Sequence, residues 1–354
     1  MNRRSYTQIP LSLEERPSWW LCRPQEIIDL CRSVKKASAE IIAETPGNYP
    51  VYALFYGDFS DQPPQSNWSA ASNRQSFNAY WSREGKAQTI CFTAGTHGAE
   101  AESVVAAMNL IKMLETGEDF RGKSDPELLE LIRQYRLIIV PCLNMDGRAI
   151  SPDHLRKAEY SDFRKISQGV WADGSEIGWL GSKEYFPLPL EKVSYPGGYP
   201  NADGFNIMHD ACPGNVRTAE AKGFLKMIER HQVDFLLHGH SCEGGPLVLL
   251  PSLFNYPCHV KRGEELANLI HHDFYTAGLE DTPLTEPLRS TDCTVNLNTM
   301  ATLASGALAL TLECSVSRHF TFEELIEPNF IMLKRVLKSG LEKPLCDRRQ
   351  IVGK

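Results

Sequence analysis

Residues 89–100 of this chain have the sequence TICFTAGTHGAE. The apolar run at 90–93 predicts a buried strand, which breaks at Gly95 before His97, Glu100 and a helix-like run. A His and a Glu three residues apart after a strand can bind one cation when the loop turns both side chains the same way, because imidazole nitrogen and carboxylate oxygen are ordinary zinc ligands. A catalytic zinc site also needs an open position for water. The rest of the chain therefore has to supply a third ligand and a base.

Outside this stretch, strand-like and helix-like segments alternate along the chain. Strands are predicted at residues 51–56, 88–94, 137–143, 233–237, 247–250 and 307–312, and helices at 25–45, 101–114, 125–134, 218–231, 260–277, 296–304 and 323–337. The run at 137–143 is almost continuously apolar, which is typical of a central parallel strand. With 354 residues, of which 42% are hydrophobic, the chain can form one α/β domain with a mixed sheet and helices on both faces.

The chain shows no internal repeat or linker. We expect residues 1–50 to form an N-terminal arm and helix, and residues 51–354 to form the catalytic domain. Residues 57–84 are mostly polar, which predicts a surface excursion. Residues 149–204 are too irregular and too long for a simple loop, which indicates that they cover or shape a site.

Composition argues against several classes of protein. The net charge of -7 argues against a nucleic-acid or anionic-membrane surface, and no basic stripe is visible. The N-terminus has no apolar core of signal-peptide length, and no apolar run reaches the length of a membrane span. The ten cysteines are scattered without a CxxC pair. These features predict a cytoplasmic protein that binds neither nucleic acid nor membrane.

Polar side chains follow four of the predicted strands. They are His97 and Glu100, Asn144 and Asp146, His238 and His240, and Glu313. In open α/β sheets, sites gather beyond the strand ends, so we expect these side chains to form the active site.

The third zinc ligand is predicted to be His238, because it directly follows the strand at 233–237. His240 is the alternative, since strand residues alternate faces and two His separated by Gly239 can point the same way. One of the two is expected to bind the metal and the other to contact substrate.

Glu313 is the candidate general base, since a carboxylate beside a zinc-bound water can take its proton and pass it to a leaving amine. Asp146 or Asn144 could orient His97 from behind the metal. Each residue alone also has an ordinary structural explanation, and the HxxE pattern recurs at 240–243. Three arginines could polarise a carbonyl or hold a substrate carboxylate: Arg148, Arg156 and Arg164.

The order of these motifs, from HxxE at 97–100 through Asn-Met-Asp-Gly at 144–147 and a late His to a strand ending in Glu313, resembles the zinc metallocarboxypeptidase family typified by carboxypeptidase A. The resemblance runs from about residue 88 to 338. It implies an eight-stranded mixed sheet between helices and a peptide substrate. It also implies one Zn²⁺ ion bound by His97, Glu100 and His238, with Glu313 as the base.

The sequence departs from the family pattern in the substrate-binding segments. The family's catalytic Arg falls in a segment that two stretches here resemble, so either Arg156 or Arg164 is expected in that place. The segment at 204–209 aligns with the family's Asn-Arg pair and ends in Met208 and His209. No Tyr occurs between Tyr275 and Glu313, where the family places one.

Three functions remain open at this stage. The first is a zinc peptidase that cleaves an amide bond near a chain end, with Asn144, His240 and His209 expected to contact substrate. The second is a zinc amidohydrolase or deacylase acting on a small acylated amino acid, which the altered Asn-Arg pair favours. The third is a binding protein on the same fold, for which the full set of zinc ligands and base would have no use. Arg217 and Arg289 are further candidates for holding a substrate carboxylate.

Overall fold

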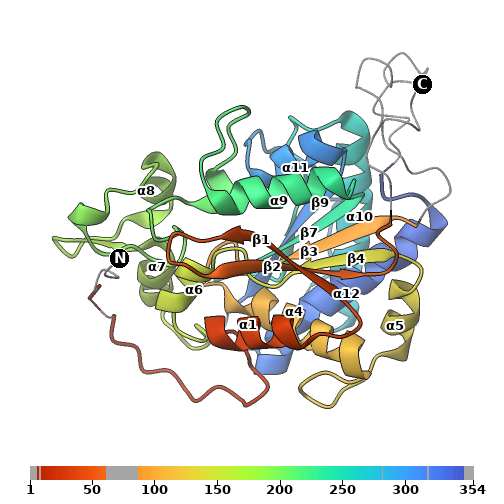
Figure 1. Cartoon of the computed structure of the whole chain (residues 1–354), viewed down its shortest axis with the longest axis horizontal. Coiled ribbons are helices and arrows are strands. Elements are labelled where there is room, and N and C mark those ends of the chain that lie inside the picture. The colour runs from red at the N-terminus through yellow and green to blue at the C-terminus, as the bar shows by residue number, and fades with distance from the viewer. Residues whose placement is uncertain (1–5, 8, 61–86, 281, 317–318, 347–354) are drawn as a thin grey trace.

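The computed structural model describes residues 6–7, 9–60, 87–280, 282–316 and 319–346. In these residues a twisted sheet lies between two layers of helices, as Figure 1 shows. The α/β class and the single domain predicted from the sequence are confirmed. The predicted excursion at 57–84 falls mostly outside the described residues.

The main sheet has seven strands in the described part of the chain, in the order β1-β2-β4-β3-β7-β9-β8. Their bounds are β1 (Ser38–Glu44), β2 (Pro50–Tyr56), β3 (Thr89–Thr93), β4 (Arg136–Val140), β7 (Phe235–Cys242), β8 (Leu247–Leu249) and β9 (Leu308–Ser315). Strands β4, β3, β7 and β9 run parallel, while β1, β2 and β8 add antiparallel edges. The sheet is therefore mixed as expected, with seven described strands where the resemblance implied eight. Two short strands, β5 (Val170–Trp171) and β6 (Val193–Tyr195), form a separate pair.

Helices cover both faces of the sheet. Their bounds are α1 (Pro24–Ser33), α4 (Ala101–Thr116), α5 (Pro126–Ile132), α6 (Met145–Ile150), α7 (Tyr160–Gln168), α8 (Gly178–Glu184), α9 (Ala219–Arg230), α10 (Pro257–Thr276), α11 (Leu297–Ser305) and α12 (Phe322–Glu342), with short 3-10 helices η1 (Leu190–Lys192) and η2 (Ile207–His209). Helices α9 and α11 pack together on one face, and α4 and α12 pack on the other (Figure 1). Among the described helices, none combines the length and the apolarity needed to cross a membrane.

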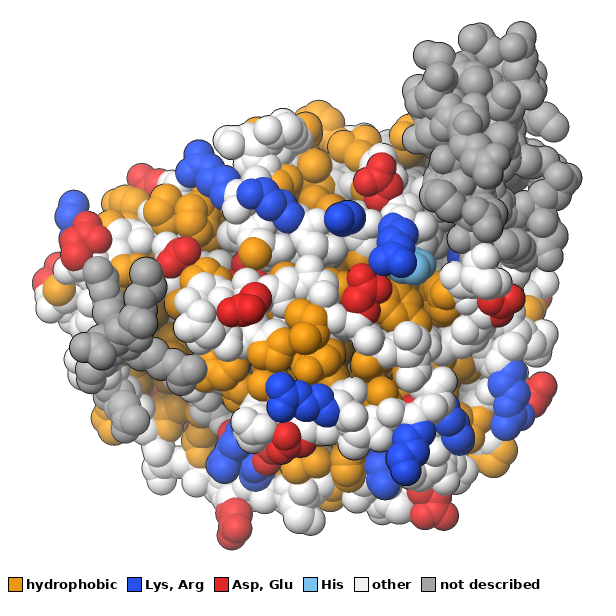
Figure 2. Space-filling model, in the orientation of Figure 1, with side chains coloured by type: hydrophobic (Ala, Val, Ile, Leu, Met, Phe, Trp, Pro, Cys, Tyr) orange, Lys and Arg blue, Asp and Glu red, His pale blue; other side chains and the backbone are white. Residues whose placement is uncertain are grey.

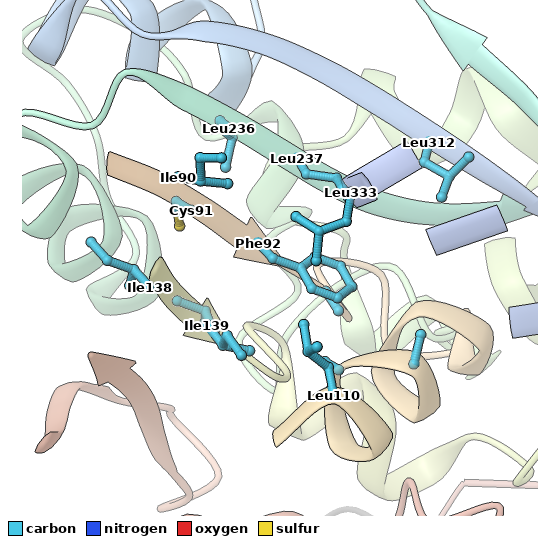
Figure 3. Close-up of a cluster of buried hydrophobic side chains, with 14 of the residues drawn as sticks. Ile90, Cys91, Phe92, Leu110, Ile138, Ile139, Leu236, Leu237, Leu312 and Leu333 are labelled. Carbon is cyan, nitrogen blue, oxygen red and sulfur yellow. The ribbon is translucent and has the colours of Figure 1, made fainter. Parts of the chain in front are cut away.

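The core lies where the central strands meet α4 and α12. Ile90, Phe92 and Leu237 are buried on the strands, and Leu110 and Leu333 come from the two helices to meet Phe92 (Figure 3). Burying each such side chain contributes roughly 1.5–3 kcal/mol. This core fixes the central strands, and with them the loops that follow β3 and β4.

The surface seen in Figure 2 mixes both signs of charge with scattered apolar side chains. No basic stripe stands out on this face, in keeping with the net charge of -7.

The helix predicted at 25–45 is wrong in its second half. Helix α1 ends at Ser33, and β1 begins at Ser38 and pairs antiparallel with β2. The buried apolar residues of α1 end at Cys31, so the residues beyond it would bury no further apolar surface by continuing the helix. Instead, β1 pairs with β2 at the edge of the sheet, and this pairing satisfies the backbone hydrogen-bonding groups of β1.

Strands β7 and β9 are both longer than the sequence indicates. They pair in parallel up to Cys242 and Ser315, so His238, His240 and Glu313 lie inside strands and not after them. The last residues of both strands include polar side chains. A prediction from apolar periodicity ends each strand where the apolar pattern ends, and so makes both strands too short. The side chains at 238 and 240 consequently share one face of the sheet.

Candidate metal and active site

The loop after β3 is held against the loop after β4. The backbone amides of Leu143 and Asn144 donate to the carbonyls of Ala94 and Gly95, and Gly98 donates to a carbonyl of the 149–204 segment at 2.6 Å. A Cβ on Gly98 would lie 2.1 Å from the backbone nitrogen of Arg148. Glycine at this position therefore allows the close approach that brings the flanking His and Glu to the end of the sheet.

Three buried side chains meet at this point. His97 Nδ1 lies 3.0 Å from Glu100 Oε1, and His240 Nδ1 lies 2.8 Å from Glu100 Oε2. The two Nδ1 atoms are 3.2 Å apart. One ligand atom from each residue falls within 4.8 Å of the others, which is the spacing of a site that could hold a metal ion.

His97 is oriented by two residues that the sequence analysis does not identify. Its Nε2 lies 3.2 Å from Asn206 Oδ1, and its ring stacks on Tyr199 with centroids 3.8 Å apart. Because an amide oxygen only accepts, Nε2 carries the proton and Nδ1 is left with a lone pair. In the segment at 204–209, the family resemblance points to Met208 and His209, whereas Asn206 is the residue that contacts His97.

His238 does not join the cluster, contrary to its prediction as third ligand. Its Nε2 lies 2.5 Å from Thr96 Oγ1, and its Nδ1 lies 2.6 Å from Asn298 Oδ1. Both ring nitrogens thus have partners. The alternative named from the sequence, His240, occupies the third position instead of the substrate-contacting one.

Glu313 lines the same cavity as His97 and His240, and this cavity has a volume of about 230 Å³. Burial raises the pKa of Glu313 well above its ordinary value, and the carboxylates of Glu100 and Glu243 add to the effect. A carboxyl group in this setting is a stronger base than an exposed one. Its position beside the cluster fits the predicted role.

The charges within the cluster support one another. Burial alone would raise the pKa of Glu100, but the imidazoles of His97 and His240 outweigh it and hold that pKa at about 2. Burial lowers the pKa of His240, and Glu100 opposes the shift. An ionised carboxylate facing imidazole nitrogens is the donor set of a divalent cation.

Asn144 and Asp146 do not face the cavity. Asn144 caps α6, accepting from the Gly147 amide at 2.9 Å, and donates to the Tyr199 carbonyl at 2.9 Å. Asp146 accepts from Thr45 Oγ1 at 2.6 Å and from the backbone amides of Gly47 and Ala202. The predicted roles in substrate binding and in orienting His97 are therefore not supported, because these side chains hold loops together.

The predicted arginines also point elsewhere. Arg156 pairs with Glu14 and donates to the Phe320 carbonyl at 2.5 Å, and Arg164 lies 3.4 Å from Glu176. The other three are likewise absent from the cavity lining: Arg148 donates to the carbonyls of Ser151 and Pro152, Arg217 lies over the Phe186 ring, and Arg289 pairs with Glu264.

Two further side chains of the cavity are His209 and Lys183. His209, expected from the sequence to contact substrate, lines the cavity near the edge of the Trp179 ring, and burial lowers its pKa to about 3. Lys183 of α8 also lines it. The irregular 149–204 segment therefore does shape the site, and it places a cation there that no motif indicates.

Residues 41–170 match the family model described as zinc carboxypeptidase. The match includes His97 and Glu100 and ends before His240 and Glu313. No curated protein matches the chain.

Several solved structures share the fold over most of the chain. The metallo-carboxypeptidase from Burkholderia cenocepacia is 16% identical, with a TM-score of 0.55, over 89% of this chain and 68% of that one. The metallo-carboxypeptidase from Pseudomonas aeruginosa in complex with (2-guanidinoethylmercapto)succinic acid is 14% identical, with a TM-score of 0.54, over 91% and 68%. Bovine thrombin-activatable fibrinolysis inhibitor in complex with tick carboxypeptidase inhibitor is 10% identical, with a TM-score of 0.54, over 92% and 99%.

Because the sequence identity to these structures is 16% or lower, the structural similarity shows a shared fold and no more. The family match covers the first two residues of the metal cluster, and the shared fold extends over most of the chain. The chain is therefore similar to zinc carboxypeptidases in sequence over residues 41–170, and to metallo-carboxypeptidases in fold over most of its length.

Proposed function

We propose that this protein is a zinc-dependent hydrolase that cleaves an amide bond in a peptide or a small acylated amino acid. The observation that carries the proposal is the convergence of His97, Glu100 and His240 within 4.8 Å, beside a cavity that Glu313 also lines.

The residues present fit a single zinc ion. Two imidazoles and one carboxylate are a known ligand set of catalytic zinc, and three protein ligands leave room for water. Asn206 leaves His97 Nδ1 with a lone pair directed at the cluster. The two Nδ1 atoms lie 3.2 Å apart, close enough for both to ligate one ion.

Bound zinc would supply Lewis-acid chemistry, making water more acidic and a carbonyl more electrophilic. Glu313 would then take a proton from the attacking water at its carboxylate and deliver it to the nitrogen of the leaving amine. A carbon–oxygen bond forms as the carbon–nitrogen bond breaks, and no redox partner is needed. His97, Glu100 and His240 would stay fixed throughout, because all three are buried and the His97 ring is held by Asn206 and Tyr199.

A deacylase acting on a small acylated amino acid is the second candidate. Two observations favour it over a peptidase for long chains. The cavity is small, at about 230 Å³, and the residues at the place of the family's Asn-Arg pair are Met208 and His209. A peptide end and an acylated amino acid both present an amide beside a carboxylate, so both fit the proposed chemistry.

Metal analysis followed by Glu313→Gln tests the proposal. We expect the purified protein to hold one zinc ion, and the variant to keep it while losing roughly 10²–10⁴-fold in kcat on a cleaved substrate. Glu243→Gln is the matched control, since Glu243 is an exposed carboxylate nearby that is expected to leave hydrolysis largely intact.

A protein that binds zinc but hydrolyses nothing in a broad panel of peptides and acylated amino acids would instead be a binding protein on this fold.

We further propose a cytoplasmic location, because the cysteines are scattered along the sequence without a pairing pattern. Cell fractionation tests this location.

A further inference from the structure

Most polar side chains in the wall of the cavity beside the metal cluster carry no charge. Among them are Ser252, Asn255, Asn296, Asn298, Thr299 and Thr311. His209 adds an imidazole that is uncharged near neutral pH, because burial lowers its pKa to about 3. No arginine occurs among the described residues that line this cavity. A wall of this composition recognises a ligand through hydrogen bonds more than through charge.

The charged residues of the wall already balance one another. Lys183 is the only lysine or arginine in the part of the wall that the structure describes, and its Nζ lies 3.8 Å from the centroid of the Trp179 ring. Asp292 lines the same cavity and opposes the fall in the pKa of Lys183 that burial causes. On the metal side, ionised Glu100 and Glu313 would balance the charge of one zinc ion. An additional carboxylate in the cavity would therefore lose its water without gaining a free counter-charge.

Two buried polar atoms of the wall have no hydrogen-bond partner among the described residues. They are Asn255 Oδ1 and His209 Nε2. An amide oxygen only accepts, so Asn255 needs an N–H or O–H group from the molecule that fills the cavity. The Nε2 atom of a neutral imidazole can donate or accept, depending on its tautomer. A ligand that completes both hydrogen bonds relieves the cost of leaving these atoms unpaired.

We propose that this cavity binds a carboxamide group of the substrate and excludes a carboxylate. A primary carboxamide has the shape of a carboxylate without its charge, and it carries an N–H donor for Asn255 and a carbonyl acceptor for His209. This inference rests on the proposed function and narrows it to substrates that present a neutral amide here in addition to the amide that is cleaved. A carboxylate elsewhere on such a substrate lies outside the cavity.

Two peptide substrates that differ in one group test this selection. N-acetyl-alanyl-phenylalanine and its C-terminal primary amide are compared in zinc-loaded wild-type protein. We expect kcat/KM to be higher for the amide than for the acid by about tenfold or more, since the acid is desolvated without a counter-charge.

Two variants of the wall separate the amide from the acid. Asn255→Leu removes the acceptor at similar size, and it should lower kcat/KM for the amide by about five- to tenfold while leaving the acid nearly unchanged. Asp292→Asn removes the charge that attracts Lys183, and it should raise kcat/KM for the acid by about fivefold without a similar effect on the amide. A purely structural role of either residue would change both substrates together.

Each variant has a matched control outside the cavity lining. Asn215→Leu changes an exposed asparagine in the same way as Asn255→Leu. Asp173→Asn changes an exposed aspartate that accepts from Ser175 two residues later, as Asp292 accepts from Thr294. Both controls should leave the ratio of the two kcat/KM values unchanged.

Equal kcat/KM for the two substrates, or a preference for the acid, would overturn the inference. An amide preference that neither Asn255→Leu nor Asp292→Asn changes would overturn it as well. The proposed function fails separately, by absence of zinc or of any hydrolysis.

If neither substrate is cleaved, calorimetry with benzamide and benzoate on the purified protein decides the inference alone. Benzamide that binds and loses about fivefold in affinity with Asn255→Leu, while benzoate does not, would support a carboxamide site. Benzamide that fails to bind, or that binds equally well to the variant, would overturn it.

Discussion

His97 and His240 face each other through their Nδ1 atoms at 3.2 Å, and each is approached by a different oxygen of Glu100. His97 reaches this position from the loop after β3, and His240 from the middle of β7. Neighbouring parallel strands bring them together, since β3 pairs directly with β7. The candidate metal site is thus built across one strand pair.

The first prediction separates the two histidines of β7. His240→Ala should reduce bound zinc from one ion per chain to nearly none, because it removes one of three ligands. His238→Gln should keep the zinc, since His238 contacts Thr96 and Asn298 and not the cluster. Metal analysis of both variants after dialysis checks this. Zinc retained in the first and lost from the second would restore His238 as the ligand.

A second prediction concerns Asn206, which lies behind His97. Asn206→Ala should weaken zinc binding by roughly 10–100-fold, because the ring of His97 loses the partner that fixes its tautomer. Competition with a fluorescent zinc chelator measures the affinity. Asn215→Ala, an exposed position in the same region, should leave it unchanged. Equal zinc affinity in the two variants would mean that Asn206 does not orient the ligand.

The glycine of the metal-binding loop gives a third prediction. A Cβ at Gly98 would lie 2.1 Å from backbone atoms of Gly147 and Arg148, which cannot move aside as a flexible side chain would. Gly98→Ala should therefore lower the free energy of unfolding by roughly 1–3 kcal/mol and reduce zinc occupancy. Urea denaturation checks the first effect. Gly244→Ala is the control, since no atom lies within 4 Å of the added carbon, and similar losses in both would argue against a specific clash.

The fourth prediction is a pH dependence of stability away from the metal site. Burial raises the pKa of Glu220 from 4.5 to about 7, with Asp146 and Asp203 adding to it and Asn201 opposing it. The folded state favours the protonated carboxyl, so this contribution to stability is present below pH 4.5 and is lost as pH rises through about 7.

Glu220→Gln removes the charge that the fold disfavours. The variant should be more stable than the parent above pH 7, by on the order of 2–3 kcal/mol, and the difference should shrink to about 1 kcal/mol or less at pH 5. Thermal unfolding at pH 5 and pH 8.5 measures it. Glu229→Gln, an exposed carboxylate on the same helix, should show no such trend. A difference independent of pH would rule out titration of Glu220 as the cause.

Much of the scaffold was predictable because its signals are local. Three elements form where their own apolar pattern predicts them, and no distant contact changes that outcome. They are β3 before Gly95, helix α4 and the buried strand β4. The HxxE spacing places two ligands on one loop, so His97 and Glu100 could be identified together. Glu313 was found through order along the chain, because it follows the last apolar run of the sheet.

The sequence analysis chose His238 over His240 as the third ligand, wrongly, because both share one face of a strand and either spacing suits a metal. Tertiary structure decided it: Thr96 and Asn298 occupy both nitrogens of His238, and Glu100 reaches only His240. Lys183 likewise enters the cavity from a segment without a motif. The sequence determined which residue types and which strands build the centre, since these follow from local pattern. The direction of each side chain depends on partners distant in the chain, and only the folded structure supplies them.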